Sequence, residues 1–233
     1  MMLCKWEDLP LELQTEEVRP YYDILREKRL SLLTKRLFDV VVSAVMLVML
    51  SPVFLVLAIA IKLDSPGPVF YRQVRVTRYG KEFRIFKFRS MVQNADKGSL
   101  LTVGADSRIT RVGKFIRKYR LDEFCQLIDI LRGTMTFVGT RPEVPKYVAH
   151  YTAEMMATLL LPAGVTSKAS ILYKDEDTIL NGAENVDEVY VTTVLPEKMK
   201  YNLNAIAEFS FFSDIQVMFM TVFAVLGKDY TPK

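Results

Sequence analysis

The chain has 233 residues, which is enough for one or two domains with a hydrophobic core. Half of its residues are hydrophobic and a quarter are charged, which is typical of a membrane-attached protein with a substantial aqueous domain and unlike a polytopic membrane protein. The net charge of +4 at pH 7 is mild, so the distribution of charge is more informative than its total. One histidine and two distant cysteines exclude a Cys/His zinc site and make a disulfide unexpected.

The first 34 residues form a polar N-terminal extension. It begins with an acidic, amphipathic segment, unlike the positive start and apolar run of a secretory signal peptide, so we expect the bulk of the protein to stay in the cytoplasm. A helix is expected over residues 21–33. Its basic residues Arg26, Lys28 and Arg29 either favour anionic lipid headgroups, by about 1 kcal/mol each, or form a solvated helix face.

An apolar run without any charge occupies residues 40–61. About 20 apolar residues in a helix are enough to cross a bilayer. Ser51 and Pro52 lie near the middle of the run, and a proline there removes a backbone donor and crowds the preceding turn, so we expect the helix to bend. Basic residues flank the run on both sides, at Lys35 and Lys62, which fits a segment whose two ends face the cytoplasm. The residues alone leave both a membrane span and a re-entrant segment open.

A β-hairpin is expected over residues 69–91, with its turn at residues 79–81, because β-branched and aromatic residues recur there between charged ones. Residues 94–110 are expected to form a polar loop. In residues 110–131, apolar and basic side chains recur at three- and four-residue spacing, which predicts a helix.

A second amphipathic helix is expected over residues 144–161. Residues 165–204 are mixed and mostly polar. The last apolar element covers residues 205–226, where Glu208 and Asp214 argue against a membrane span because an ionised carboxylate in hydrocarbon costs several kcal/mol. We expect this element to be a helix that is buried against the protein or lies at the membrane interface.

Asp122 and Glu123 are adjacent acids, so on a helix their side chains would diverge by roughly 100°. This arrangement suits a division of labour in which one carboxylate attacks a substrate and the other holds a metal ion. Basic residues that can neutralise phosphate or contact anionic lipid surround the pair: Arg111, Lys114, Arg117, Lys118 and Arg120. The competing interpretation is an ordinary helix face whose acids and bases form surface ion pairs.

Three further basic residues are candidates for phosphate contact. Lys87 and Arg89 alternate along the second predicted strand, where a solvent-facing strand is the competing interpretation. Arg141 lies in a proline-containing turn, a geometry suited to bidentate phosphate contact. We interpret Asp129 as a loop or surface acid and His150 as a surface residue. The sequence contains no P-loop, no GxGxxG after a strand and no GxSxG elbow.

Four short motifs occur in an order that resembles the bacterial sugar transferases, in particular the small monotopic polyprenyl-phosphate phosphoglycosyl transferases. The motifs are SP (51–52), KFRSM (87–91), LDE (121–123) and RPE (141–143), within similar segments at residues 35–91 and 103–147. Their joint occurrence in this order is highly specific, and the resemblance covers nearly all of residues 35–226.

The resemblance implies a mixed α/β fold that is mostly helical. Its expected parts are a re-entrant membrane helix hairpin at residues 40–61, a short β-hairpin, and amphipathic interfacial helices around a cytoplasmic catalytic domain. It divides the chain into the extension, residues 1–34, and a transferase domain, residues 35–233. The implied location is the cytoplasmic face of the bacterial inner membrane.

The implied reaction transfers a phosphosugar from a UDP-sugar to polyprenyl (undecaprenyl) phosphate, with release of UMP and use of Mg²⁺. By the same resemblance, Asp122 attacks the β-phosphorus to form a covalent phosphosugar intermediate, and Glu123 holds the metal ion. The residues expected to bind substrate phosphate are Arg141, Lys87, Arg89 and Arg120. Membrane lipids are expected partners, and nucleic acid is not.

Two other hypotheses stay open at this point. One is a non-catalytic membrane-surface module that scaffolds a glycan assembly complex through its basic helices. The other is an ordinary single-span protein with an unrelated cytoplasmic domain.

Overall fold

The computed structural model describes residues 2–93, 95, 107–173, 176–181, 183 and 185–225. The described chain is mostly helical and contains two small two-stranded sheets, so the predicted mixed α/β class is confirmed. Most of the polar loop expected over residues 94–110 lies outside the described residues.

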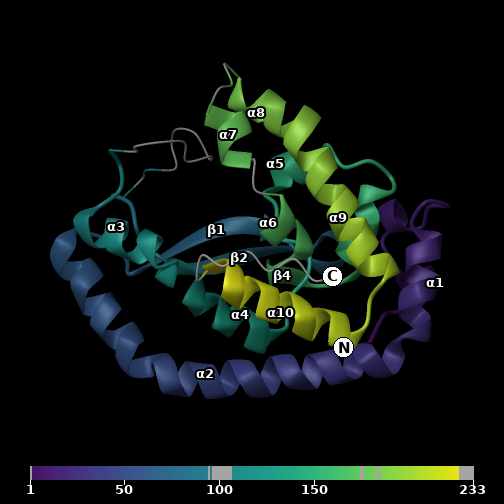
Figure 1. Cartoon of the computed structure of the whole chain (residues 1–233), viewed down its shortest axis with the longest axis horizontal. Helices are drawn as coiled ribbons and strands as arrows, with labels where there is room; N and C mark the ends of the chain where they lie inside the picture. The colour runs from purple at the N-terminus through teal and green to yellow at the C-terminus, as the bar shows by residue number, and fades with distance from the viewer. Residues whose placement is uncertain are drawn as a thin grey trace.

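Figure 1 shows the elements in their spatial arrangement. The helices are α1 (Arg19–Glu27), α2 (Arg29–Asp64), α3 (Arg111–Lys118), α4 (Leu127–Arg132), α5 (Pro145–Val148), α6 (Lys168–Leu172), α7 (Glu176–Asn181), α8 (Val186–Val189), α9 (Leu195–Ala207) and α10 (Phe211–Val225). The strands are β1 (Phe70–Val76), β2 (Glu82–Phe88), β3 (Met135–Val138) and β4 (Ala163–Thr166). Shorter helical turns are η1 (Trp6–Asp8), η2 (Leu11–Leu13), η3 (Arg78–Gly80), η5 (Leu121–Gln126), η6 (Met155–Leu160) and the π-helical η7 (Tyr190–Val194).

The apolar run lies within α2, an uninterrupted helix of 36 residues that runs along the lower edge of the molecule and turns upward towards α3 (Figure 1). It is long and apolar enough to cross a bilayer, and most of its apolar part is exposed. Pro52 cannot supply the N–H that the carbonyl of Val48 would bind in a regular helix. The hydroxyl of Ser51 donates to that carbonyl at 2.8 Å instead. The Ser-Pro pair is therefore accommodated within one helix without leaving this carbonyl unpaired in an apolar segment, and the helix hairpin expected over residues 40–61 is not confirmed.

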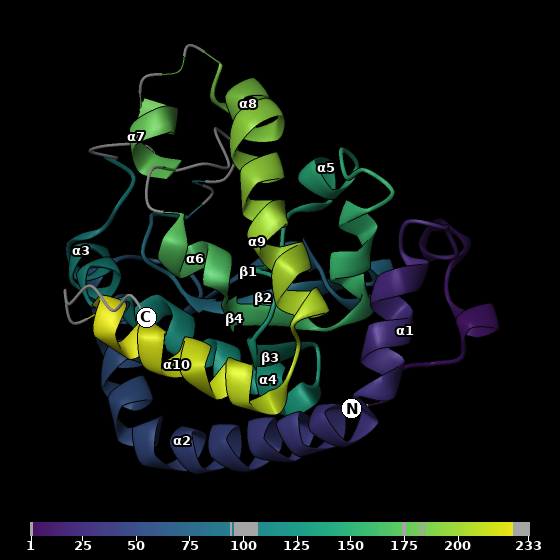
Figure 2. The same cartoon turned by 45° about the vertical axis from the view of Figure 1, so that its right-hand side comes forward.

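Buried charges fasten α2 to the rest of the protein. The ammonium group of Lys35 contacts the carboxylate of Asp214 in α10 and donates to the carbonyl of Val138 in β3 at 2.7 Å. One turn further along α2, the carboxylate of Asp39 accepts from the hydroxyl of Thr136 at 2.7 Å. We call Lys35, Asp39, Thr136 and Asp214 the latch cluster. It holds α2 against α10 and β3. α10 lies along α2 in both views (Figures 1 and 2).

The predicted β-hairpin is confirmed. β1 and β2 pair antiparallel with Phe70 opposite Phe88 and Val76 opposite Glu82, and the turn between them contains η3. The second sheet was not predicted: β3 and β4 pair in parallel. β4 begins at residue 163, directly after the segment in which the helix over residues 144–161 was expected.

The prediction of a single helix over residues 110–131 is wrong, because the helix is interrupted at Arg120. That residue has a left-handed backbone conformation, with φ of 53°, and a left-handed residue cannot continue a right-handed helix. The segment therefore divides into α3, the 3₁₀ turn η5 and α4.

The amphipathic helix expected over residues 144–161 is also wrong. The chain forms α5, an irregular link and η6, because its apolar stripe serves two different cores. Val144 and Tyr147 pack with Tyr190 and Val194, whereas Leu159 packs against the N-terminal extension. A single straight helix could not reach both.

The C-terminal half is more helical than its polar composition indicates. Residues 165–204 contain α6, α7, α8 and most of α9, which the sequence reading did not resolve. The apolar element expected over residues 205–226 divides between the end of α9 and α10. α10 packs on α2, α6 and β3 with Val217 and Met220 buried, as expected for a helix that lies against the protein.

The N-terminal extension joins the largest core of the described residues. Leu13, Val18 and Leu25 are buried against Leu160 and Ile206, which lie in η6 and α9. Residues 2–34 are therefore built into the folded body and do not form a separate tail.

Candidate active site

Asp122 and Glu123 lie in the 3₁₀ turn η5, which packs against β2. The left-handed backbone at Arg120 turns the chain out of the line of α3 just before the two acids. Cys125, which is fully buried beneath them, donates from its thiol to the carbonyl of Asp122 at 3.2 Å. The pair is thus presented by a short, anchored turn rather than by the continuous helix that the sequence suggested.

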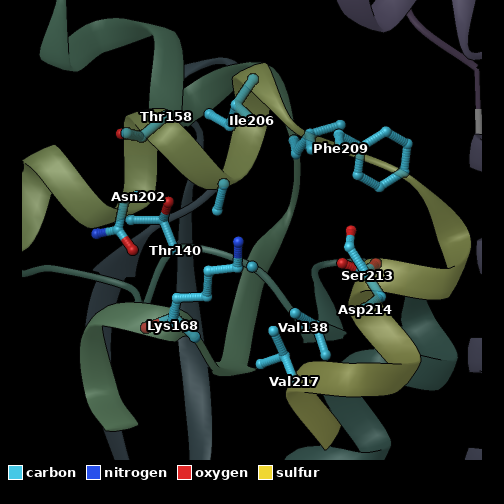
Figure 3. Close-up of a pocket in the computed structure, with 14 residues that line it drawn as sticks. Val138, Thr140, Thr158, Lys168, Asn202, Ile206, Phe209, Ser213, Asp214 and Val217 are labelled. Atoms are coloured by element: carbon cyan, nitrogen blue, oxygen red, sulfur yellow. The ribbon is translucent and has the colours of Figure 1, made fainter. Parts of the chain in front are cut away.

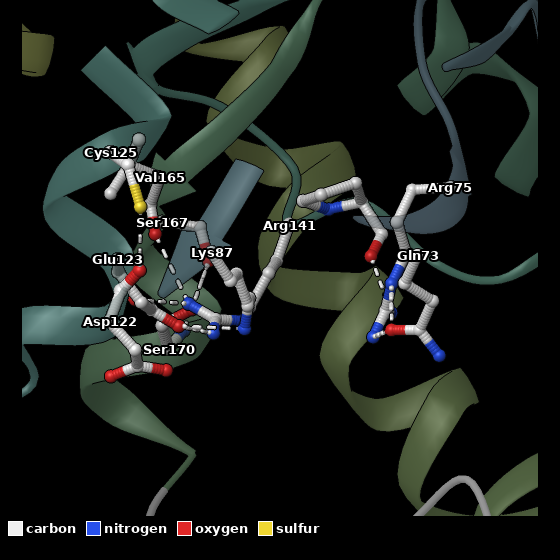
Figure 4. Close-up of polar contacts among 11 residues, drawn as sticks. Gln73, Arg75, Lys87, Asp122, Glu123, Cys125, Arg141, Val165, Ser167 and Ser170 are labelled. Atoms are coloured by element: carbon white, nitrogen blue, oxygen red, sulfur yellow. Dashed lines mark hydrogen bonds and ion pairs between the residues drawn. The ribbon is translucent and has the colours of Figure 1, made fainter. Parts of the chain in front are cut away.

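Two cations hold the carboxylate of Glu123 (Figure 4). The guanidinium of Arg141 binds both of its oxygens, with Nη1 donating to Oε2 at 3.3 Å and Nη2 contacting Oε1. The ammonium group of Lys87, on β2, approaches Oε1 at 3.3 Å. We call Glu123, Arg141 and Lys87 the clamp. The structure therefore brings together three of the residues that the sequence predicted as separate candidates.

Asp122 lies beside the clamp but outside it. Its carboxylate points away from Arg141 in Figure 4, and within the described part of the chain it forms no ion pair. The dyad is therefore asymmetric: one acid is fixed by two cations, and its neighbour is left available to a substrate.

The surroundings shift the pKa values of the two acids in opposite directions. Burial alone would raise the pKa of Glu123, but Arg141 and Lys87 hold it at about 2. Burial raises the pKa of Asp122, with Lys87 opposing the rise and Glu123 adding to it. The ordinary pKa of this carboxyl group is 3.8. A carboxylate whose pKa is raised above its ordinary value is a better nucleophile, as long as it stays ionised at neutral pH.

The turn that carries Arg141 is fixed by close backbone packing between β3 and β4. The nitrogen of Gly139 donates to the carbonyl of Thr166 at 3.0 Å, and the nitrogen of Gly164 donates to that of Thr140 at 2.8 Å. A β-carbon at Gly164 would collide with the backbone of Gly139, so glycine is required for this approach. The packing also places the carbonyl of Val165 3.2 Å from Nη1 of Arg141, which orients the guanidinium.

A cavity of about 740 Å³ opens over the dyad. Its lining is largely polar and basic and includes Asp122, Glu123, Lys87, Arg141, Arg117, Lys118 and Arg120. This volume is within the range of small-molecule sites, and the excess of cations suits an anionic ligand. The pocket in Figure 3, between β3, α9 and α10, measures about 40 Å³ and is too small for a ligand of that size.

The other two predicted phosphate-binding residues lie differently. Arg120 is exposed at the wall of the cavity, and its contact with substrate stays a prediction. Arg89 also borders the cavity, but its guanidinium is buried and donates to the carbonyls of Ser65 and Pro66 at 2.7 Å. In this arrangement Arg89 caps the C-terminal end of α2 and is not brought to the dyad.

Asp129 is not a surface acid, as the sequence reading proposed. It is buried, and its carboxylate accepts from the backbone nitrogen of Phe86 at 2.8 Å, joining α4 to β2. His150 is exposed, as expected.

Sequence reasoning missed a buried network behind Arg141. Glu143, the acid of the RPE motif, accepts from the hydroxyl of Tyr190 at 2.5 Å, and Lys198 donates to that hydroxyl at 3.3 Å. From β1, Arg75 donates to the carbonyl of Pro142 at 2.9 Å. Glu143 lies two residues from Arg141, and that proximity was the available signal. The residues that contact Glu143 are distant in sequence, so no sequence pattern indicated them.

The residues present are compatible with a bound Mg²⁺. This ion is commonly held by one or two carboxylates together with substrate phosphate oxygens and water, so Asp122 and Glu123 are a sufficient donor set. Among the described residues there is no group of three or more acidic, histidine or cysteine side chains that would form an all-protein cage. Glu123 now shares its oxygens with Arg141 and Lys87, so a metal ligated there would compete with the clamp.

The comparisons with known proteins give the class of this protein directly. A family model described as "Bacterial sugar transferase" matches residues 30–228. The chain therefore belongs to the bacterial sugar transferase family.

Curated relatives give narrower names. A UDP-N-acetylgalactosamine-undecaprenyl-phosphate N-acetylgalactosaminephosphotransferase from Aeromonas hydrophila is 33% identical over 196 residues, covering 82% of this chain and 43% of the relative. A UDP-glucose:undecaprenyl-phosphate glucose-1-phosphate transferase from Escherichia coli strain K12 is 35% identical over 195 residues, covering 82% and 40%. A transferase of the same name from Caulobacter vibrioides is 32% identical over 201 residues, covering 84% and 71%. The chain thus spans about two fifths of the length of the Aeromonas and Escherichia relatives.

Proposed function

We propose that this protein transfers a sugar 1-phosphate from a UDP-sugar to a polyprenyl phosphate, such as undecaprenyl phosphate, and releases UMP. Membership of the bacterial sugar transferase family and the names of the relatives support the substrate classes. The observation that carries the chemistry is the asymmetric dyad: among the described residues Asp122 has no ion-pair partner at the wall of a basic cavity, beside a Glu123 that two cations keep ionised.

Asp122 is the proposed nucleophile. One of its oxygens forms a bond to the β-phosphorus of the UDP-sugar, the bond from that phosphorus to the bridging oxygen breaks, and UMP leaves with the electron pair. An oxygen of the polyprenyl phosphate then bonds to the same phosphorus, the bond to Asp122 breaks, and the carboxylate is restored. Two steps allow the soluble nucleotide to leave before the lipid phosphate reacts.

The surrounding cations have a defined task in this scheme. A carboxylate and two or more phosphate groups concentrate negative charge, so the transition state requires preorganised positive charge. Arg141 presents a planar fork suited to phosphate oxygens, and Lys87 presents a compact charge beside it. A Mg²⁺ held by Glu123, when bound, would neutralise the diphosphate charge further. The clamp keeps Arg141 and Lys87 ordered through Glu123 until the substrate phosphates arrive.

We further propose that α2 enters one leaflet of the bacterial inner membrane and returns, with the catalytic cavity on the cytoplasmic face. The basic residues at both ends of the apolar run support this topology, and α2 curves along its length although it continues through Pro52 (Figure 1). Cysteines introduced at the exposed positions Thr34 and Lys62 in a Cys4→Ser background test it in intact cells. Labelling of both sites only after the membrane is permeabilised agrees with a re-entrant helix, and labelling of one site from outside rules it out.

The reaction is tested with purified full-length protein, undecaprenyl phosphate, Mg²⁺ and a panel of UDP-sugars, with UMP release as the measurement. We expect Asp122→Asn to lower UMP release on the order of 10³-fold or more, because the amide is not a nucleophile. Mass spectrometry should show a phosphosugar adduct on the unmodified protein and none on this variant. Asp187→Asn, which changes an exposed acid paired with Lys146, is the matched control and should leave the rate unchanged.

Full activity of Asp122→Asn would contradict the covalent mechanism. If no UDP-sugar in the panel released UMP while the protein stayed bound to membranes, the non-catalytic scaffold would be the better hypothesis.

A further inference from the structure

A second basic cavity, of about 360 Å³, lies between the N-terminal segment and the junction of α1 and α2. Among the described residues, four cationic side chains and one acidic side chain line it: Lys5, Arg19, Arg26, Arg29 and Glu7. All five of these residues precede the match to the family model, which begins at residue 30. The cavity therefore belongs to the extension and not to the transferase site.

The N-terminal wall of this cavity is held in place by hydrogen bonds. The hydroxyl of Tyr22 donates to the carbonyl of Cys4 at 2.9 Å, and the nitrogen of Cys4 donates to the hydroxyl of Tyr79 at 3.0 Å. Trp6 packs edge to face on Tyr22, with their ring centroids 5.1 Å apart. These contacts tie the segment to α1 and to the β1–β2 turn, so the cavity is a built feature of the fold.

Two of its arginines are available to a ligand. Arg19 is already engaged, since it pairs with Asp23 at 3.0 Å and lies 4.7 Å from the centre of the Trp6 ring. Arg26 and Arg29 are exposed, and neither forms an ion pair or a side-chain hydrogen bond within the part of the chain that the structure describes. Two unpaired guanidinium groups lining one cavity favour an anion with several oxygens, above all a phosphate.

The position of Arg29 relative to α2 indicates where that phosphate comes from. Arg29 is the first residue of α2, and large exposed apolar side chains follow it at four-residue intervals, at Leu33, Leu37, Val41 and Val45. Residues four apart are separated by about 40° around a helix and about 6 Å along its axis, so Leu33 and Leu37 lie closest to the side of α2 that carries Arg29. If this exposed stripe contacts hydrocarbon, Arg29 lies at the end of the stripe, at the depth of the lipid phosphates.

From these observations we propose that the extension forms a binding site for the headgroup of an anionic phospholipid of the phosphatidylglycerol class, with Arg26 and Arg29 holding its phosphate. The proposal rests on the proposed membrane attachment of α2 but not on the transferase activity. Under this proposal, residues 2–29 bind the anionic phospholipids of the membrane to which the domain is attached.

The chain carries its own reporter for this site, because Trp6 is its single tryptophan and lines the cavity. Full-length protein in an uncharged detergent is titrated with dihexanoyl phosphatidylglycerol, dihexanoyl phosphatidylcholine or inorganic phosphate, and Trp6 fluorescence is recorded. We expect a saturable change with phosphatidylglycerol, at concentrations about tenfold lower than for the other two probes. No saturable change, or equal response to phosphatidylcholine, overturns the proposal. Equal response to inorganic phosphate assigns the site to free phosphate and overturns the lipid source.

Matched variants separate the cavity from general surface charge. Arg29→Gln and Lys28→Gln remove the same charge at adjacent exposed positions, but only residue 29 lines the cavity. Arg29→Gln should weaken phosphatidylglycerol binding about tenfold, and Arg26→Gln/Arg29→Gln further, while Lys28→Gln stays within about twofold. Equal weakening by Arg29→Gln and Lys28→Gln would overturn the proposal. Circular dichroism checks that the variants fold, and UMP release in detergent should be unchanged in all of them, so failure here is distinguishable from failure of the proposed reaction.

Discussion

The latch cluster and the clamp both pair cationic and carboxylate side chains, but they differ in their exposure to solvent and to a cavity. In the latch, Lys35 and Asp39 are 3% and 1% exposed, and each has partners from β3 or α10. In the clamp, the side chains of Glu123 and Arg141 are 16% and 36% exposed and border a cavity of about 740 Å³. The neighbouring Asp122 forms no ion pair with any residue that the structure describes.

This difference in exposure distinguishes charges that stabilise the fold, as in the latch cluster, from charges that are accessible to a substrate, as in the clamp. A buried pair whose members satisfy each other fixes the position of two elements, but offers nothing to a ligand. A pair at a cavity wall, next to a carboxylate without a cation, can exchange its partners for phosphate oxygens or a metal ion. The proposal that Asp122 reacts with substrate therefore rests on this asymmetry rather than on the number of charges.

The largest effect is expected from breaking the latch. Lys35→Met should lower the free energy of unfolding by about 3–5 kcal/mol, because it leaves the carboxylate of Asp214 buried without its cation. The double variant Lys35→Met/Asp214→Leu should recover most of this loss, since an apolar pair of similar volume carries no desolvation penalty. Chemical denaturation in detergent, followed by circular dichroism, measures both.

The matched control for the latch is Lys146→Met, which breaks a pair with Asp187 whose two side chains are about half exposed. It should change stability by about 0–1 kcal/mol, because surface pairs contribute little. If the double latch variant were no more stable than Lys35→Met, the loss would come from packing of α2 and not from an unpaired charge.

The local features of this chain were predictable from sequence, and its long-range pairings were not. The β-hairpin follows from alternation within about twenty residues, and the residues of the dyad and clamp follow from short motifs. The latch joins Lys35 to Asp214 across 179 positions and Asp39 to Thr136 across 97. No periodicity within one element reports a partner at such a distance.

The failures over residues 110–131 and 144–161 have a different cause. Helical spacing of apolar residues shows which side chains are buried but not whether they share one core, and the stripe from Val144 to Leu159 serves two. The left-handed Arg120 breaks its helix although arginine itself favours helix. Such a conformation costs about 1–3 kcal/mol and persists because the packing of η5 on β2 overrides local preference next to the dyad.

A smaller effect, confined to pH dependence, is expected from the clamp side of the comparison. Burial raises the pKa of Asp122, and Lys87 opposes that rise, so Lys87→Gln should raise the pKa further. If Asp122 is the nucleophile, as proposed, it must be ionised to attack, and activity should be lost as the pH falls through its pKa. The acidic limb of the pH profile of kcat/KM for UMP release should therefore move to higher pH in this variant, in addition to any loss of rate at neutral pH. The control is Lys118→Gln, which removes a charge from the same cavity. Lys118 is not among the groups that shift the pKa of Asp122, so the acidic limb of the pH profile should stay in place in this variant. If the acidic limb moved to lower pH in Lys87→Gln, or moved equally in Lys118→Gln, Lys87 would not be the group that stabilises the ionised form of Asp122.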